Sequence, residues 1–128
     1  MSGTSAIGEI SLMEDAERMA AMPGGVALTE SVYYILLSLA RGKRHGYGIM
    51  QQVEEMSGGR VTLAAGTLYG ALSTLAGKGW IEELPADPDS RRKEYSLTQA
   101  GREALTSELG RLRELAANGA RVLEGDPL

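Results

Sequence analysis

The segment that decides the fold covers residues 62–97 and reads TLAAGTLYGALSTLAGKGWIEELPADPDSRRKEYSL. Within it, Leu68, Leu72 and Leu75 recur at helical spacing, so one face of a short helix is apolar and must be buried. The opposite face carries small and hydrogen-bonding residues, namely Gly66, Gly70, Ser73 and Gly77, with Tyr69 and Thr74 on its flanks. Gly77 and Gly79 predict the end of the helix. This second face can approach another surface closely.

A β-hairpin is predicted directly after this helix. Two strand-like runs, residues 80–84 and 93–97, are joined by a segment with two prolines, two aspartates and a serine. Proline excludes regular strand pairing, so the join is a loop. The loop ends in three cationic residues, Arg91, Arg92 and Lys93. A helix followed by a hairpin with a basic edge is typical of a recognition helix and a wing, an arrangement that binds DNA.

Composition limits the chain to one domain with appendages. It has 128 residues, 43% of them hydrophobic, which is enough for one modest core. The absence of cysteine excludes disulfides and thiolate metal sites and suits a reducing compartment. The apolar run at residues 32–37 is far shorter than the roughly 20 residues that cross a bilayer, and no signal-peptide layout is present. We therefore expect a soluble, cytoplasmic protein with no membrane partner.

Charge is unevenly distributed along the chain. The formal net charge is −4, but residues 41–93 carry eight basic and six acidic side chains, a local charge of +2. The remainder of the chain therefore carries −6. A mildly positive middle between acidic ends suits a dimer that meets DNA with one face, because local charge governs the encounter.

The residues before the decisive segment complete a helix-turn-helix. Thr29 can cap a strongly apolar helix that ends near Gly42, and residues 41–46 form a basic, glycine-broken loop. A second helix over residues 47–56 is ended by the glycine-rich turn at 57–59. The order of helix, loop, helix, turn, helix and hairpin predicts a winged helix-turn-helix domain over residues 26–98, so the fold is mainly α with a small β-hairpin.

Both ends of the chain predict further helices. In the extension at residues 1–25, a capping box at 11–14 starts a short helix on which Leu12 and Met19 share one face. In the dimerisation region at residues 99–128, Thr98 caps a long helix to about Leu123. Its apolar residues follow coiled-coil spacing, and they are Leu105, Leu109, Leu112, Ala116 and Leu123. We expect this seam to pair with the same helix of a second copy, with Leu12 and Met19 alongside.

Four segments resemble, in order and spacing, the signature segments of PadR-like transcriptional regulators. They are HGYGI at 45–49, GTLYGAL at 66–72, GWI at 79–81 and RKEYSLTQAG at 92–101. The resemblance covers roughly residues 28–112. It implies a dimeric bacterial repressor whose recognition helix enters the major groove and whose wing contacts the DNA backbone or minor groove. Several members of this family are released from DNA by phenolic acids or flat drug-like molecules.

Three features depart from the family pattern. Ala64 and Ala65 stand where relatives often have Ser or Pro, so a side-chain cap worth about 1 kcal/mol is missing. Gly70 stands where Pro is common, which removes bulk from the groove-facing side. The last helix has no aromatic residue of the kind with which some members sandwich planar drugs. We therefore expect small-molecule sensing, where present, to involve Trp80 and the amino-terminal helix.

The candidate DNA-binding residues combine hydroxyls with cations. They are Tyr47, Thr67, Tyr69, Ser73, Thr74, Lys78, Arg91, Arg92 and Lys93. The face of the recognition helix has no Arg or Lys, so it cannot make bidentate guanine contacts. We expect closeness and DNA shape to supply specificity there, while the cations bind phosphates and supply affinity. The basic turn could also be an ordinary solvated loop, but its place beside the helix favours phosphate contact.

Other readings of single residues and of the whole chain stay open. Trp80 most simply packs in the core, with a ligand platform as the alternative. His45, the only histidine, has no acidic or cysteine partners at ligand spacing, which favours a hydrogen-bonded loop residue over a metal ligand or catalyst. The sequence predicts no metal, no cofactor and no enzyme activity, because it offers no paired nucleophile and base. A winged-helix module for protein or RNA contact is the remaining alternative.

Overall fold

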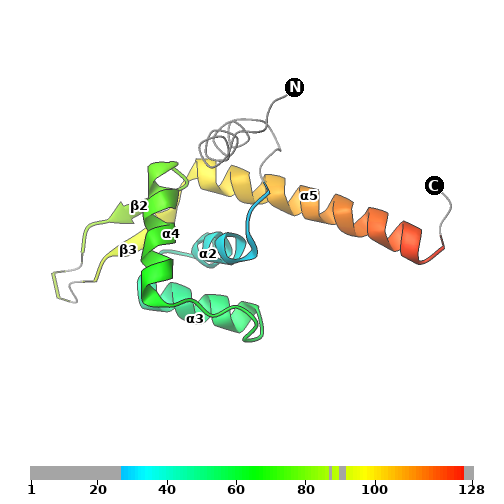
Figure 1. Ribbon diagram of the computed structural model, residues 1–128. Helices are drawn as coiled ribbons and strands as arrows, with labels where there is room; N and C mark the ends of the chain where they lie inside the picture. The colour runs from blue at the N-terminus through cyan, green and yellow to red at the C-terminus, as the bar shows by residue number, and fades with distance from the viewer. Residues whose placement is uncertain (1–26, 87, 90–91, 126–128) are drawn as a thin grey trace, which may run out of the picture. The chain divides into compact units, whose positions relative to one another are not determined.

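The computed structural model describes residues 27–86, 88–89 and 92–125 (Figure 1). The chain divides into two compact units, one of them Leu28–Leu105, and the other including the helical residues that follow Leu105. Two predicted features lie outside the described residues. One is the amino-terminal helix with Leu12 and Met19, and the other is Arg91 in the wing. Within the described part, no helix is both long and apolar enough to span a bilayer.

The first two helices of the Leu28–Leu105 unit begin at side-chain caps. Helix α2 spans Glu30–Ala40, and the Thr29 hydroxyl accepts a hydrogen bond from the Val32 amide at 3.2 Å, as predicted. Helix α3 spans Gly46–Met56 and is capped by the His45 ring. Together α2 and α3 bury a set of aliphatic side chains that form part of the core, namely Ile35, Leu36, Leu39, Ile49 and Val53.

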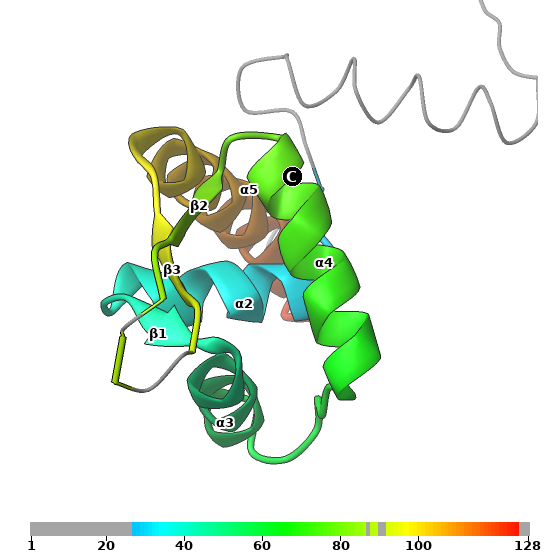
Figure 2. The same ribbon diagram turned by 90° about the vertical axis from the view of Figure 1, so that its left-hand side faces the viewer.

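Helix α4 is the predicted recognition helix and spans Ala65–Gly77. The turn before it contains Gly58 and Gly59 at φ values of +64° and +83°, which glycine adopts without a Cβ penalty. Leu68, Leu72 and Leu75 are buried, as their spacing predicts. In Figure 2, α2 crosses the middle of this unit between α4 and the strands, and α3 lies below it.

The sheet has three strands where the sequence predicted only a hairpin. Strands β2 (Ile81–Leu84) and β3 (Glu94–Leu97) form the wing, and β1 (Arg44–His45) pairs antiparallel with β3. The prediction that residues 41–46 are wholly loop was therefore wrong. A two-residue strand leaves no periodicity to detect, and it is fixed by tertiary contacts, since Arg44 Nε donates to the Ser38 carbonyl at 2.9 Å.

Helix α5 (Gln99–Leu123) begins at the base of the wing, as predicted. The Thr98 hydroxyl accepts from the Gly101 amide at 3.0 Å and donates to the Gly79 carbonyl at 2.6 Å. A Cβ placed on Gly101 would lie 2.9 Å from the Trp80 carbonyl carbon. This close backbone approach requires glycine and fixes the start of α5 against the first residue of the hairpin. The prediction of a mainly α winged helix-turn-helix is confirmed.

Candidate nucleic-acid interface

The outer face of α4 is exposed and carries no charge. Gly66, Thr67, Gly70, Ser73 and Gly77 are all exposed. A Cβ added at any of the three glycines would meet nothing within 4 Å, so the packing of the chain does not require glycine there. The Thr74 hydroxyl, predicted to contact DNA, donates to the Gly70 carbonyl at 3.2 Å inside the helix. The first turn has no side-chain cap, as the alanine at position 64 predicted.

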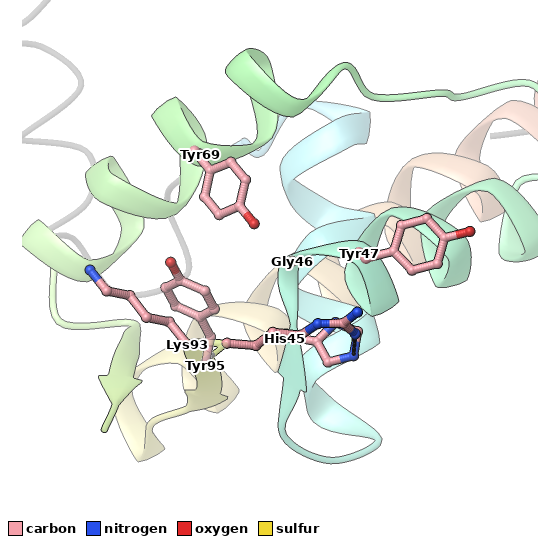
Figure 3. A pocket seen from close by; sticks show the side chains of 7 residues that line it. His45, Gly46, Tyr47, Tyr69, Lys93 and Tyr95 are labelled. Carbon is pink, nitrogen blue, oxygen red and sulfur yellow. Dashed lines mark hydrogen bonds between the residues drawn. The ribbon is translucent and has the colours of Figure 1, made fainter. Parts of the chain in front are cut away.

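A pocket of about 540 Å³ lies beside this face, where α3, α4 and β3 converge (Figure 3). It is lined by His45, Gly46, Tyr47, Tyr69, Arg92, Lys93 and Tyr95. The pocket thus brings together four predicted DNA-binding residues, from the starts of α3 and α4 and from the wing. His45 and Tyr95 also line the pocket, although neither was predicted as a partner of that group. The HGYGI segment carried a signal for His45, because a histidine before a helix can serve as its cap.

Tyr69 connects α4 with the start of α3. Its ring crosses toward Gly46, where an added Cβ would lie 2.8 Å from the phenol Cζ. Figure 3 shows the Tyr95 hydroxyl directed toward α4 and the Tyr69 hydroxyl directed toward Gly46, while Tyr47 points away. Burial raises the pKa of the Tyr95 phenol, with smaller contributions from Glu83 and Tyr69. Tyr95 therefore stays a neutral hydrogen-bonding group, and Tyr47, which is 60% exposed, is open to a partner.

The cations near the pocket are held in place by neighbours. Lys93 Nζ lies 2.9 Å from a Glu83 carboxylate oxygen, and this hydrogen bond raises the pKa of the lysine. Arg92 Nη1 lies 3.2 Å from His45 Nε2. Lys78 Nζ lies 5.5 Å from the centre of the Trp80 ring, a cation–π contact. All three cations are nevertheless exposed and can approach an anion.

Trp80 belongs to the core of the unit. Its side chain is only 9% exposed, and it does not line the pocket described above. The position agrees with the packing interpretation of the sequence. A ring that is 9% exposed offers little area on which a planar ligand could stack.

Helix α5 carries exposed leucines along much of its length. Leu109 and Leu112 are each more than one-third exposed, and Leu123 is 87% exposed. Leu105 is different, because it is already buried within the single chain. Its place in the dimer seam stays a prediction. Leu115 and Val122 are also exposed but were not predicted as part of the seam. Between them and Leu105, the buried Glu108 carboxylate receives two hydrogen bonds from Arg111, at 2.9 and 2.6 Å.

Three helices followed by a two-stranded wing, with β1 completing the sheet, define a winged helix-turn-helix protein. The chain belongs to the PadR-like family of transcriptional regulators, because the family model described as "Transcriptional regulator PadR-like family" matches residues 35–107, more than half of the chain.

Solved structures agree with this assignment. A PadR family transcription regulator from Clostridium difficile R20291 is 27% identical, with a TM-score of 0.64, covering 74% of this chain and 99% of that one. Bacillus subtilis PadR in complex with operator DNA is 28% identical, with a TM-score of 0.55, covering 61% of this chain and 44% of that one.

A sequence relative is much longer than this chain. An uncharacterised 37.1-kDa protein of transposon Tn4556 from Streptomyces fradiae is 39% identical over 90 residues, which are 70% of this chain. The chain spans 24% of that protein's length.

Proposed function

We propose that this protein is a dimeric transcriptional repressor that binds a pseudo-palindromic DNA operator through α4 and the wing. The observation that carries the proposal is the exposed, uncharged face of α4 lying beside a pocket edged by Arg92 and Lys93. Small residues let the helix backbone approach base edges, and the neighbouring cations are suited to the flanking phosphates. The Bacillus subtilis relative, solved with operator DNA, supports this choice of partner.

A gel-retardation experiment tests DNA binding directly. A duplex that carries the promoter of the protein's own gene should be retarded, and a random duplex of the same length should compete poorly. RNA of the same sequence should not compete. Retardation of RNA alone, or of neither nucleic acid, would instead favour the module that contacts RNA or protein.

Dimerisation is supported by the exposed leucines of α5. Leu109 and Leu112 lie three residues apart on one side of this helix, and each would be left in contact with water in a single copy. Burying them against a second copy is the simplest way to remove that exposure, and two-fold symmetry then implies two DNA half-sites about one helical turn apart or a multiple of it.

The variant Leu109→Asp tests the dimer. Sedimentation should find monomers, and operator binding should be lost, because a charge cannot be buried in the seam. The control is Gln51→Asp, which places the same charge at an exposed position outside α5 and should leave the dimer intact. A Leu109→Asp protein that sediments as the wild-type dimer would refute the seam.

Release by a small molecule is the remaining part of the proposal. It rests on the family resemblance, and the absence of aromatic residues from α5 argues against a ligand sandwiched on that helix. Titration with planar phenolic acids, with Trp80 fluorescence and DNA release followed together, tests it. If no phenolic changes either signal, control by protein abundance alone is favoured.

A further inference from the structure

We infer that His45 is itself a DNA-contacting residue, whose Nε2–H donates a hydrogen bond to a backbone phosphate beside Arg92. The inference deepens the proposed function and rests on it. His45 was predicted to have only a local role in its loop. Its position between the start of α3 and the wing instead places its ring in the pocket that adjoins the outer face of α4.

Two N–H donors face the two nitrogens of the His45 ring. The Gly48 amide lies 3.2 Å from Nδ1, and the Arg92 Nη1 lies 3.2 Å from Nε2. A neutral imidazole has one acceptor nitrogen and one N–H, and an imidazolium accepts no hydrogen bond at all. Only one of these two close contacts can therefore be a hydrogen bond.

The contact with Gly48 is the one that the fold favours. The Gly48 amide belongs to the first turn of α3, where backbone N–H groups lack an acceptor within the helix, and its direction is fixed by the backbone. The Arg92 guanidinium carries five N–H groups on a long, exposed side chain, so it does not depend on the His45 ring as its acceptor. Accordingly, Nδ1 accepts from Gly48 and the proton of the neutral ring lies on Nε2.

This tautomer makes the ring and the guanidinium a pair of converging donors. The Nε2–H of His45 then lies beside the Arg92 guanidinium, with Nε2 3.2 Å from Nη1, so an anion that reaches the ring meets two neighbouring donors. Lys93 and the hydroxyls of Tyr69 and Tyr95 line the same pocket (Figure 3). An acceptor with negative charge and several oxygens fits such a set, and a phosphodiester beside the groove that α4 occupies supplies one.

The test compares His45→Asn with the wild type on a duplex that the wild-type protein selects from a random pool. Asparagine is a good helix cap, so the variant keeps an acceptor for Gly48 but loses the Nε2–H. DNA affinity should fall about 2- to 10-fold, the range for one neutral hydrogen bond. The slope of log affinity against log salt should not change, because a neutral donor displaces no counterion. His45→Ser, which also caps, replaces His45→Asn if thermal melting shows that the latter is unfolded.

Duplexes with single methylphosphonates identify the contact. A methylphosphonate at one position of the duplex should lower the DNA affinity of the wild type by a larger factor than that of His45→Asn. The variant has already lost one hydrogen bond to that phosphate. The inference would be overturned if His45→Asn bound DNA as tightly as the wild type and every methylphosphonate weakened both proteins by the same factor. His45 would then be a helix cap only. A wild-type protein that selects no duplex would instead refute the proposed function, and the inference with it.

Discussion

The outer face of α4 and the pocket beside the wing differ in the charge of their residues and in the contacts that those residues make within the chain. On α4, the exposed residues from Gly66 to Gly77 are small and uncharged, and a Cβ on the glycines would touch nothing. Around the pocket, Arg92 and Lys93 are cationic, and each lies beside a side chain from another segment of the chain, His45 for Arg92 and Glu83 for Lys93. The difference indicates two roles, in which α4 supplies close approach and the pocket supplies charge.

Glycine use separates the same two regions. A glycine inside a helix costs up to about 1 kcal/mol relative to alanine, so it needs a reason. Gly46 and Gly101 have one in the structure, because Tyr69 and the Trp80 backbone occupy the space of a side chain. Gly70 has none within the chain. We propose that its small size serves the close approach of DNA, which the following variants test.

The largest effect is expected for Gly70→Glu. A carboxylate in the middle of the outer face of α4 should block the approach to DNA by bulk and by repulsion from phosphates, weakening operator binding by at least about 100-fold. The fold should be intact, because the position is open. Gln51→Glu, which adds the same charge to the exposed side of α3, is the matched control and should bind within a few-fold of wild type. Normal operator binding by Gly70→Glu would show that this face does not dock.

A pair of alanine variants should change stability in opposite directions. Gly101→Ala forces a methyl group against the Trp80 carbonyl carbon and should destabilise the protein by about 1 to 3 kcal/mol. Gly70→Ala removes a helix-interior glycine in open space and should stabilise it by up to about 1 kcal/mol. Urea unfolding measures both. Equal effects would remove the distinction between enclosed and open glycines.

Ala64→Ser should strengthen the start of α4. The residue has the extended backbone of a helix cap but no side chain to accept an amide, and serine should add about 1 kcal/mol to the free energy of unfolding. Hydrogen exchange of the first-turn amides of α4 should slow in parallel. Ala76→Ser, at an exposed position near the other end of the helix, is the control and should show no gain. Unchanged hydrogen exchange in Ala64→Ser would mean that the first-turn amides of α4 already have hydrogen-bond acceptors.

The smallest effect is expected for Glu83→Gln. The Lys93–Glu83 pair is exposed, with 62% and 46% of the two side chains accessible, so water and salt screen it and it is weak. Releasing Lys93 and removing a negative charge near the pocket should tighten DNA binding by about 2- to 5-fold at low salt. Glu82→Gln, on the adjacent residue of β2, is the control. Equal tightening by both variants would indicate a general charge effect and no competition for Lys93.

Most of the winged helix could be predicted from the sequence because its signals are local. Each of these signals acts over a few residues: the leucine spacing in α4, the caps at Thr29 and Thr98, and the glycines that end the helices. The long α5 was predicted over its full range for the same reason. Strand β1 was missed because two residues form it only when β3 is present beside them.

The candidate site was predicted only in part because it depends on contacts between distant segments. The exposed outer face of α4 follows from periodicity alone, since the buried leucines define the opposite side. The partnership of His45 with Arg92 joins residues 47 positions apart, and no pattern in either segment indicates it. Leu105 fits the coiled-coil spacing and is also buried within the single chain, and no pattern in the sequence indicates that burial.

The division of labour between α4 and the wing is tested most directly by salt titration of the double variant Arg92→Ala/Lys93→Ala on operator and random duplexes. Affinity for both duplexes should fall by the same factor, and the log–log salt slope should become shallower by about 0.9 for each lost phosphate contact. Arg41→Ala, an exposed cation outside the pocket, provides the control. A double variant that keeps the wild-type slope but no longer distinguishes operator from random DNA would mean that the wing reads sequence, contradicting the account.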